Sequence, residues 1–253
     1  MPLRPWQRLP HNFQHHHLPI CSSTQDEARE RYQMGQPLVV LADEQMSGRG
    51  RLGRSWEGGP GNLLVSFALP ISQDVASFAM MIAAREVAVF VQDLVHEKVQ
   101  VKWPNDVLIN GQKVAGIIGE FEQAHSCLLL GLGMNIQSTP HVSDARHRPT
   151  SLADHGFHED VRQELCKCLC GVFSKWLENK TPTEHIVERL EEVCFPKGSY
   201  VRLLSQSDAL EGSFDGLTRE GHLKLVDSKG DQHVVVAGDV LQCRLEDKDA
   251  SGY

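Results

Sequence analysis

The segment GRGRLGRSW, residues 48–56, places three arginines and three glycines within nine positions. A glycine costs roughly 0.5–1 kcal/mol in a regular element, so this spacing disfavours a helix or a smooth strand. The guanidinium groups of Arg49, Arg51 and Arg54 repel one another unless an anion lies among them, and their planar forks match carboxylate or phosphate. We therefore predict an anion-binding loop whose glycines let the backbone approach the ligand, with a solvated basic turn as the alternative.

The segment KWPND, residues 102–106, interrupts a region rich in β-forming residues. Pro104 cannot donate a hydrogen bond to a sheet, so Asn105 and Asp106 are expected at a strand edge or bulge. A turn without a function has no need of the flanking lysine and tryptophan. This segment is therefore a second candidate for chemistry.

Two glycine-bearing segments follow, GQKVAGIIGE and GLGMNI. The first brings Lys113 off a predicted hairpin, and Gly116 leaves room for a ligand to lie against the strand. A single hairpin lysine is otherwise a solvated edge residue. The second segment sets two glycines before Asn135, where glycines alone often mark only a bulge.

These segments supply cations, glycines and one asparagine, but neither a Ser-His-Asp array nor a metal cage. They match neither the phosphate-binding pattern G-x-x-x-x-G-K-[ST] nor the dinucleotide-binding pattern G-x-G-x-x-G between a strand and a helix. Charge stabilisation and positioning are the chemistry that such groups provide. Phosphoryl or nucleotidyl transfer needs little else.

The helices and strands that must position these residues can be predicted from the periodicity of apolar residues and from the positions of capping residues, glycines and prolines. A short strand and then a helix are expected at the start, the helix capped by Ser22, Ser23 or Thr24 and ending near Gly35. Asn110-Gly111 is a strong hairpin signal. The remaining expectations are strands over 37–45 and 62–70, the longest helix over 74–95, helices over 158–178 and 183–193, and short strands after 198.

The composition is that of a soluble globular protein, with 253 residues, 41% of them hydrophobic and 23% charged. A net charge of −8 argues against general nucleic-acid binding, which requires a basic face. No apolar run approaches a membrane span, and the beginning of the chain lacks the apolar core of a signal peptide. We therefore expect a cytoplasmic protein.

Seven cysteines without paired spacing indicate reduced thiols, which agrees with a cytoplasmic location. Cys166, Cys168 and Cys170 lack the usual zinc spacing. Cys166 and Cys170 fall on one helical face, so we expect them in the core. The histidines at 15–17 have no carboxylate or cysteine partner nearby in the sequence, and we expect no metal there.

The motifs STQDEA, DEQMSGRGRLGRSW, NLLVSFAL, VKWPNDVLINGQKVAGIIGE and LGLGMNI, taken together, resemble the signature series of bacterial biotin protein ligases. Their order and spacing agree with that family, and the resemblance runs from about residue 18 to 245. It implies an α+β fold, in which a mixed β-sheet flanked by helices, like that of class II synthetases and biotin/lipoate ligases, precedes a small SH3-like β-barrel. The implied domains are a catalytic domain over 1–196 and the barrel over 197–253.

The resemblance also implies a reaction. The family makes biotinyl-5′-AMP from biotin and ATP, with Mg²⁺, and transfers biotin to a lysine of a carboxylase carrier domain, such as that of acetyl-CoA carboxylase. Repressor-type members carry an N-terminal DNA-binding winged helix for which this sequence has no room, so it resembles the ligase-only type. Expected partners are therefore biotin, ATP and a biotin carboxyl carrier protein, without DNA or membrane, for a monomer or weak homodimer.

Two alternatives stay open at this point. Lipoate-protein ligases and octanoyltransferases share the catalytic fold and a comparable lysine, although GRGRLGR with KWPND disfavours them. A non-catalytic biotin sensor belongs to another functional class. It would be expected to lack Lys113 or the arginines, which are all present.

Site residues follow by matching the motifs. The implied catalytic residues are Lys113, which would bind the biotin carboxylate and then the acyl-phosphate, and Arg51. The implied biotin-binding residues are Ser23, Thr24, Gln25, Gln45, Gly48, Arg49, Gly50, Arg51, Lys113 and Gly116. The implied ATP-binding residues are Arg49, Arg51, Arg54, Trp56, Asn105, Asp106, Lys113 and Asn135. Whether Asn105 and Asp106 orient phosphate, magnesium or the incoming lysine is left open, and no metal ligand is assigned.

Overall fold

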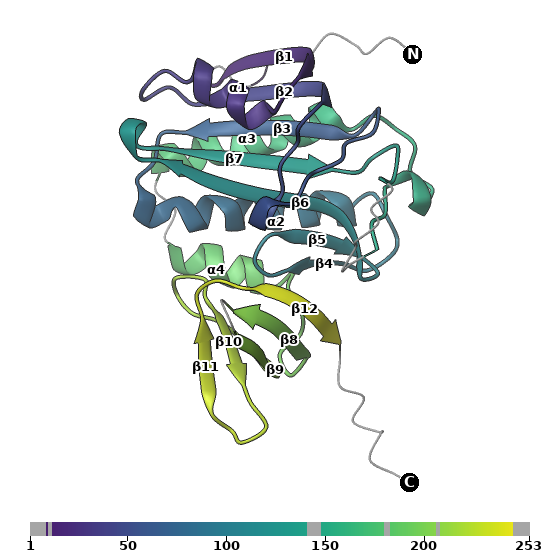
Figure 1. The fold of residues 1–253 in the computed structure, drawn as a ribbon, viewed down its shortest axis with the longest axis vertical. Coiled ribbons are helices and arrows are strands. Elements are labelled where there is room, and N and C mark those ends of the chain that lie inside the picture. Colours follow the sequence, from purple (N-terminus) through teal and green to yellow (C-terminus); the bar gives the residue numbers. More distant parts are fainter. Residues whose placement is uncertain (1–8, 10–11, 141–147, 180–182, 206–207, 245–253) are drawn as a thin grey trace.

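A large mixed sheet forms the centre of the protein (Figure 1). The structure is a computed structural model that describes residues 9, 12–140, 148–179, 183–205 and 208–244. The seven strands lie in the order β1 (Gln14–Cys21), β2 (Leu38–Gln45), β3 (Leu63–Leu69), β7 (Cys127–Met134), β6 (Gln112–Glu122), β5 (Asp106–Ile109) and β4 (Val99–Lys102). Strands β1 and β2 are parallel, and every other neighbouring pair is antiparallel. The mixed sheet expected from the sequence is confirmed.

One face of this sheet carries the main core. Alternate residues of β3, such as Phe67, point to helices α2 (Ala76–Gln92) and α3 (Arg162–Asn179). The rings of Phe67 and Phe173 meet edge to face with centroids 5.3 Å apart. The helices expected over 74–95 and 158–178 are present as α2, with 17 residues, and α3, with 18.

The opposite face is covered only in part. Helix α1 (Thr24–Arg31) begins at Ser23, whose hydroxyl accepts a hydrogen bond from the Gln25 N–H at 3.3 Å, so the second of the three predicted caps is the one used. Beneath α1 lies a small apolar cluster around Ala28 and Leu129. Beyond that cluster, the same face carries glycines of β6 and β7 and is left hollow.

Short turns and 3₁₀ segments join these elements. Asn110 and Gly111 have φ angles of 48° and 79° and connect β5 to β6, which confirms the predicted hairpin. The segment KWPND forms the turn between β4 and β5. The 3₁₀ segments are η1 (Arg51–Gly53), η2 (Gln73–Val75), η3 (Gln123–His125) and η4 (Ala153–His155).

A second, antiparallel sheet follows helix α4 (Thr183–Glu191). Its strands lie in the order β11 (Gln232–Val235), β10 (Leu223–Val226), β9 (Asp208–Leu217), β8 (Tyr200–Ser205) and β12 (Asp239–Arg244). It docks against the KWPND turn, because Lys102 Nζ donates to the Val240 carbonyl at 3.2 Å and Trp103 Nε1 donates to the Gly221 carbonyl at 2.9 Å. Both contacts are buried, so the two sheets meet next to one of the chemical motifs.

The cysteines of α3 have the predicted structural role. Cys166 and Cys170 are fully buried in the main core, and burial raises the pKa of the Cys170 thiol to about 12. These thiols therefore behave as small apolar groups. None of the helices in the described ranges is long and apolar enough to cross a membrane.

The packing of the second sheet against helix α2 can be tested at Gly221, in the turn between β9 and β10. Its φ is +82°, and a Cβ there would lie 1.6 Å from the Met81 Cε. Gly230 is a matched control, because its φ is +88° and a Cβ would meet nothing within 4 Å. We predict that Gly221→Ala lowers the free energy of unfolding by about 1–3 kcal/mol more than Gly230→Ala, since Met81 must repack. Urea unfolding curves that are equally shifted for both variants would contradict this packing.

Candidate active site

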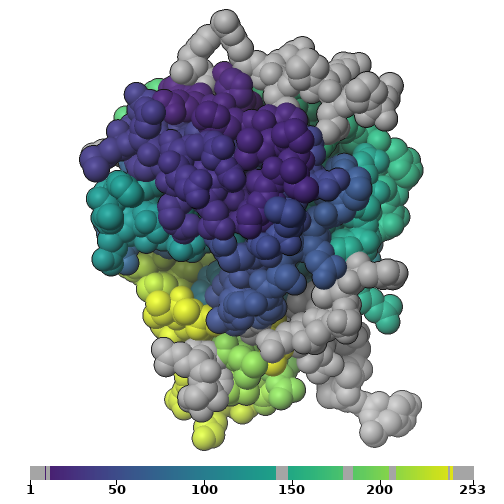
Figure 2. Space-filling model, turned by 45° about the horizontal axis from the view of Figure 1, so that its top comes forward, coloured from purple at the N-terminus to yellow at the C-terminus, as the bar shows by residue number. Residues whose placement is uncertain are grey.

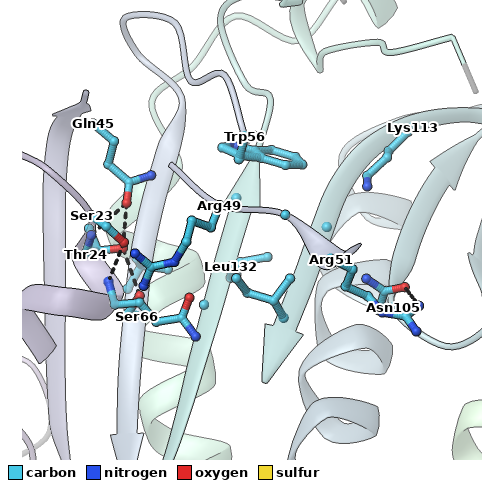
Figure 3. A pocket seen from close by; sticks show the side chains of 17 residues that line it. Ser23, Thr24, Gln45, Arg49, Arg51, Trp56, Ser66, Asn105, Lys113 and Leu132 are labelled. Carbon is cyan, nitrogen blue, oxygen red and sulfur yellow. Dashed lines mark hydrogen bonds between the residues drawn. The ribbon is translucent and has the colours of Figure 1, made fainter. Parts of the chain in front are cut away.

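The hollow face of the large sheet contains a cavity that is open to solvent (Figure 3). Most of the residues singled out in the sequence line it: Ser23, Thr24, Gln25, Gln45, Arg49, Gly50, Arg51, Trp56, Asn105, Lys113 and Gly116. Six further lining residues were not assigned to the site from the sequence, although two of them are the glycines of GLGMNI: Val65, Ser66, Ile118, Gly131, Leu132 and Gly133. Figure 3 shows hydroxyl and amide groups at one end, Arg51, Asn105 and Lys113 at the other, and Trp56 between them.

The hydroxyl and amide end is a connected hydrogen-bond network. The Gln45 Oε1 accepts from the Thr24 backbone N–H at 2.7 Å and from the Thr24 hydroxyl at 3.0 Å. The Thr24 and Ser66 hydroxyls lie 2.8 Å apart, and Gln25 Nε2 donates to the Leu129 carbonyl at 3.3 Å. Such neutral donors and acceptors suit an uncharged ring that itself both donates and accepts. Ser66 had a signal in the sequence, because it is the one polar residue in the apolar run LLVSFAL.

The middle of the cavity is occupied by the indole of Trp56. A Cβ added at Gly133 would lie 2.2 Å from the ring, and one added at Gly116 would lie 3.0 Å from it. Both glycines keep regular register in the sheet, so they mark no bulge but make room for the indole. The Trp56 Nε1 is buried without a hydrogen-bond partner among the described residues, and the Lys113 ammonium lies 5.4 Å from the ring centroid.

At the cationic end, one buried carboxylate holds two lysines. Asp106 is 6% exposed, with Oδ1 lying 2.7 Å from Lys113 Nζ and Oδ2 lying 3.0 Å from Lys102 Nζ. Burial alone would raise the pKa of Asp106, but the two ammonium groups more than offset it and hold that pKa below its ordinary value. The carboxylate is therefore ionised at neutral pH. The three groups together carry one net positive charge, and Lys113 presents it to the cavity.

Two loop arginines are bound by acceptors of the chain itself. Arg49 donates to both oxygens of Asp26 at 2.7 Å, and this hydrogen bonding lowers the pKa of the Asp26 carboxyl. Arg51 donates to the Asn105 Oδ1 at 3.0 Å and to the Gly238 carbonyl at 3.3 Å. The loop thus reaches the second sheet, and in Figure 2 the blue atoms of the chain near residue 50 lie next to the green and yellow atoms of that sheet. An entering anion would compete with these acceptors.

Four predicted residues lie outside the cavity lining: Gly48, Arg54, Asp106 and Asn135. Gly48 closes the neck of the loop, where its carbonyl accepts from the Trp56 N–H at 2.9 Å and a Cβ would lie 2.4 Å from the Trp56 carbonyl oxygen. Asn135 is 1% exposed, donates to the Thr150 carbonyl at 2.9 Å, and has no partner for Oδ1 among the described residues. Arg54 is exposed on the loop.

The chain resembles known proteins over most of its length. Residues 18–135 match the Biotin/lipoate A/B protein ligase family. The "Bifunctional ligase/repressor BirA" of Bacillus spizizenii is 31% identical over 225 residues, which cover 83% of this chain and 69% of that relative. These matches place the chain in the biotin/lipoate class of protein ligases. The chain belongs to the biotin protein ligase family.

Two further comparisons show how far the similarity to known proteins extends. The protein of the same name from Bacillus subtilis is 31% identical over 131 residues, which cover 48% of this chain but only 40% of that relative. The solved structure "Biotin protein ligase from Aquifex aeolicus in complex with biotin and ATP" superposes with a TM-score of 0.77 at 24% identity, covering 92% of this chain and 99% of that one. This structural match establishes the shared fold.

The described residues hold no group of three or more His, Cys, Asp or Glu side chains that could bind a metal ion. Both oxygens of Asp106 are engaged by lysines. The carboxylate therefore acts here as a counter-ion.

The role of Asp106 can be tested by Asp106→Asn. Breaking a buried ion pair typically costs about 3–5 kcal/mol, and we expect a loss of that order at pH 7 because two lysines lose their counter-ion. The folded-state pKa lies below the ordinary value of 3.8, so the stabilisation is present above that pH and is lost only as the pH falls through the lower, folded-state pKa.

Urea unfolding at several pH values measures this effect. The difference between the parent and Asp106→Asn should stay constant from about pH 8 to pH 5. Asp93→Asn, at an exposed position, is the control and should change stability by less than about 0.5 kcal/mol. A difference that shrinks between pH 7 and pH 5 would show that Asp106 titrates there and would contradict the proposed pairing.

Proposed function

We propose that this protein activates biotin with ATP to form biotinyl-5′-AMP and then transfers biotin to one lysine of a carboxylase carrier domain. The observation that carries the proposal is the division of the cavity into a neutral hydrogen-bonding end and a cationic end. A ureido ring, which donates and accepts, fits the Thr24, Gln45 and Ser66 network. A carboxylate and phosphates fit the Lys113 and Arg51 end.

In the first step, a biotin carboxylate oxygen attacks the α-phosphorus of ATP. The new bond joins that carboxylate oxygen to the α-phosphorus, and the bond from the α-phosphorus to the oxygen that bridges it to the β-phosphorus breaks, so pyrophosphate leaves. Lys113 lies where it can neutralise the attacking carboxylate and the charge that develops on the phosphoryl oxygens. The loop arginines would exchange their present acceptors, Asp26 and Asn105, for phosphate oxygens.

In the second step, the ε-amine of the acceptor lysine attacks the acyl carbon. The carbon–oxygen bond to phosphate breaks, AMP leaves with that oxygen, and the amine loses a proton as the amide forms. Until then, the glycine-arginine loop would cover the mixed anhydride and exclude water that would hydrolyse it.

The nucleotide contacts are assigned by chemistry. We propose that the exocyclic amine of adenine donates to the Asn135 Oδ1, which lacks a partner among the described residues, once the residues that now bury Asn135 move aside. The indole of Trp56 offers a stacking surface. Mg²⁺ would enter on the triphosphate, because both Asp106 oxygens already bind lysines.

A lipoate ligase is the nearest alternative function. The dithiolane of lipoate has no hydrogen-bond donor, whereas the neutral hydrogen-bonding end of this cavity offers an amide and two hydroxyls. Incubation with ATP, Mg²⁺, a carrier domain and either biotin or lipoate, followed by intact mass measurement, separates the two. We expect one biotin on one lysine and no transfer of lipoate; preferential transfer of lipoate would overturn the proposal.

Lys113 should contribute more to the rate than to binding. Removing one preorganised electrostatic donor costs on the order of 10²–10³ in rate, so Lys113→Ala should slow single-turnover biotinyl-AMP formation by about that factor. Biotin affinity, measured by calorimetry, should fall less because the Thr24 and Gln45 contacts remain. Lys113→Arg should recover little, since the planar guanidinium displaces the carboxylate. A near-normal rate for Lys113→Ala would remove Lys113 from the mechanism.

We expect Arg51 to slow the escape of biotinyl-AMP from the cavity. Arg51→Gly removes the hydrogen bonds to Asn105 and Gly238, so we predict faster escape of biotinyl-AMP and biotin labelling of unrelated lysines nearby. Leu52→Gly is a matched control, because Leu52 is 75% exposed in the same loop and its replacement frees the backbone without removing a guanidinium. Equal off-target labelling by both variants would assign retention to loop stiffness and not to Arg51.

A further inference from the structure

The backbone of Lys113 is held by a segment far along the chain. The Lys113 N–H donates to the Arg148 carbonyl at 2.9 Å, and the Lys113 carbonyl accepts from the Thr150 N–H at 2.9 Å. The register between β5 and β6 shifts beside Lys113, at a β-bulge. At this bulge the backbone of Lys113 pairs with residues 148–150 in parallel fashion. The position of the lysine therefore depends on where that segment lies.

Thr150 is in turn fixed by an acid–histidine–hydroxyl array. The Thr150 Oγ1 lies 3.0 Å from the His155 Nε2, and the His155 Nδ1 lies 3.1 Å from the Glu97 Oε1. An ionised carboxylate can only accept, so the His155 Nδ1 donates to Glu97, and the ring is held between that carboxylate and the Thr150 hydroxyl. Hydrogen bonding to His155 lowers the pKa of Glu97, which keeps the carboxylate ionised. Thr150 is 1% exposed and has no access to a substrate.

Two other groups complete the anchoring of this segment. The Asn135 amide donates to the Thr150 carbonyl at 2.9 Å. The Asp154 carboxylate accepts from the Ser151 N–H at 3.0 Å and lies 3.4 Å from the Thr150 Oγ1. Every one of these contacts converges on the residues that pair with Lys113.

We propose that Glu97, His155 and Thr150 are positioning residues that fix Lys113 for the adenylation step. The inference rests on the proposed role of Lys113. The Lys113 side chain makes an ion pair with Asp106 but is 27% exposed, so its backbone anchor limits how far the ammonium can move. A misplacement of about 1 Å in a catalytic group can cost as much as about 10² in rate.

Thr150 offers a matched pair of variants. Thr150→Val keeps the volume and removes the hydroxyl, whereas Thr150→Ser keeps the hydroxyl. We expect Thr150→Val to slow single-turnover biotinyl-AMP formation by about tenfold, within the range that small misplacements cause, with little change in the KM for biotin. Thr150→Ser should retain most of the rate. Equal rates for the two variants would overturn the proposal.

A double-mutant cycle with Lys113→Ala separates positioning from general destabilisation. If the array acts through Lys113, Thr150→Val should have no further effect on the rate in the Lys113→Ala background. The same tenfold loss in both backgrounds would overturn the inference and leave the proposed function intact. A Lys113→Ala variant of normal rate would instead overturn the proposed role of Lys113.

If Thr150→Val does not fold, Glu97→Ala tests the same acid–histidine–hydroxyl array with a second variant. The Glu97 side chain is 34% exposed, so its removal leaves the core intact. We expect a loss of several-fold in the adenylation rate that is again absent in the Lys113→Ala background. A loss of equal size in both backgrounds would contradict the proposal.

Discussion

The site depends on the buried carboxylate of Asp106 and the two lysines that it binds. One of them, Lys102, also donates to the Val240 carbonyl in the second sheet, while the other, Lys113, faces the cavity. The positive charge at the cationic end therefore forms together with the contact between the two sheets. Arg51 repeats this arrangement, since it binds Asn105 of the KWPND turn and Gly238 near β12. We infer that docking of the second sheet and assembly of the cationic end of the cavity are one event.

The hollow that accepts a ligand comes from the alternation of side chains in the large sheet. Residues such as Val39 and Phe67 send their side chains into the core under α2 and α3, whereas the short α1 is the only helix in the described ranges that covers the opposite face. Glycines at 116, 131 and 133 lie on that uncovered face. They leave space for the Trp56 indole and, in the proposed reaction, for a substrate beside it.

Much of this arrangement could be predicted because its signals are local. The Ser23 cap and the Asn110-Gly111 turn each follow from a few neighbouring residues, whereas the mixed sheet and most of the residues that line the cavity were expected from the resemblance to a known family. The contacts between distant segments could not be predicted in this way. Arg49 binds Asp26, and Thr150 pairs with Lys113, but no spacing in the sequence relates these partners. Gly116 was expected to make room for a ligand, and only the folded chain shows Trp56 lying over it.

The proposed reaction forms an acyl-phosphate from a carboxylate at the cationic end of this cavity. Biotin labelled with ¹⁸O in both carboxylate oxygens tests this claim, because the oxygen that attacks the α-phosphorus must leave with AMP when the lysine is acylated. With ATP, Mg²⁺ and a carrier domain, mass spectrometry should find one ¹⁸O in each AMP and one retained in the amide carbonyl of the biotinylated lysine. Release of unlabelled AMP, or of ADP in place of AMP, would contradict the account.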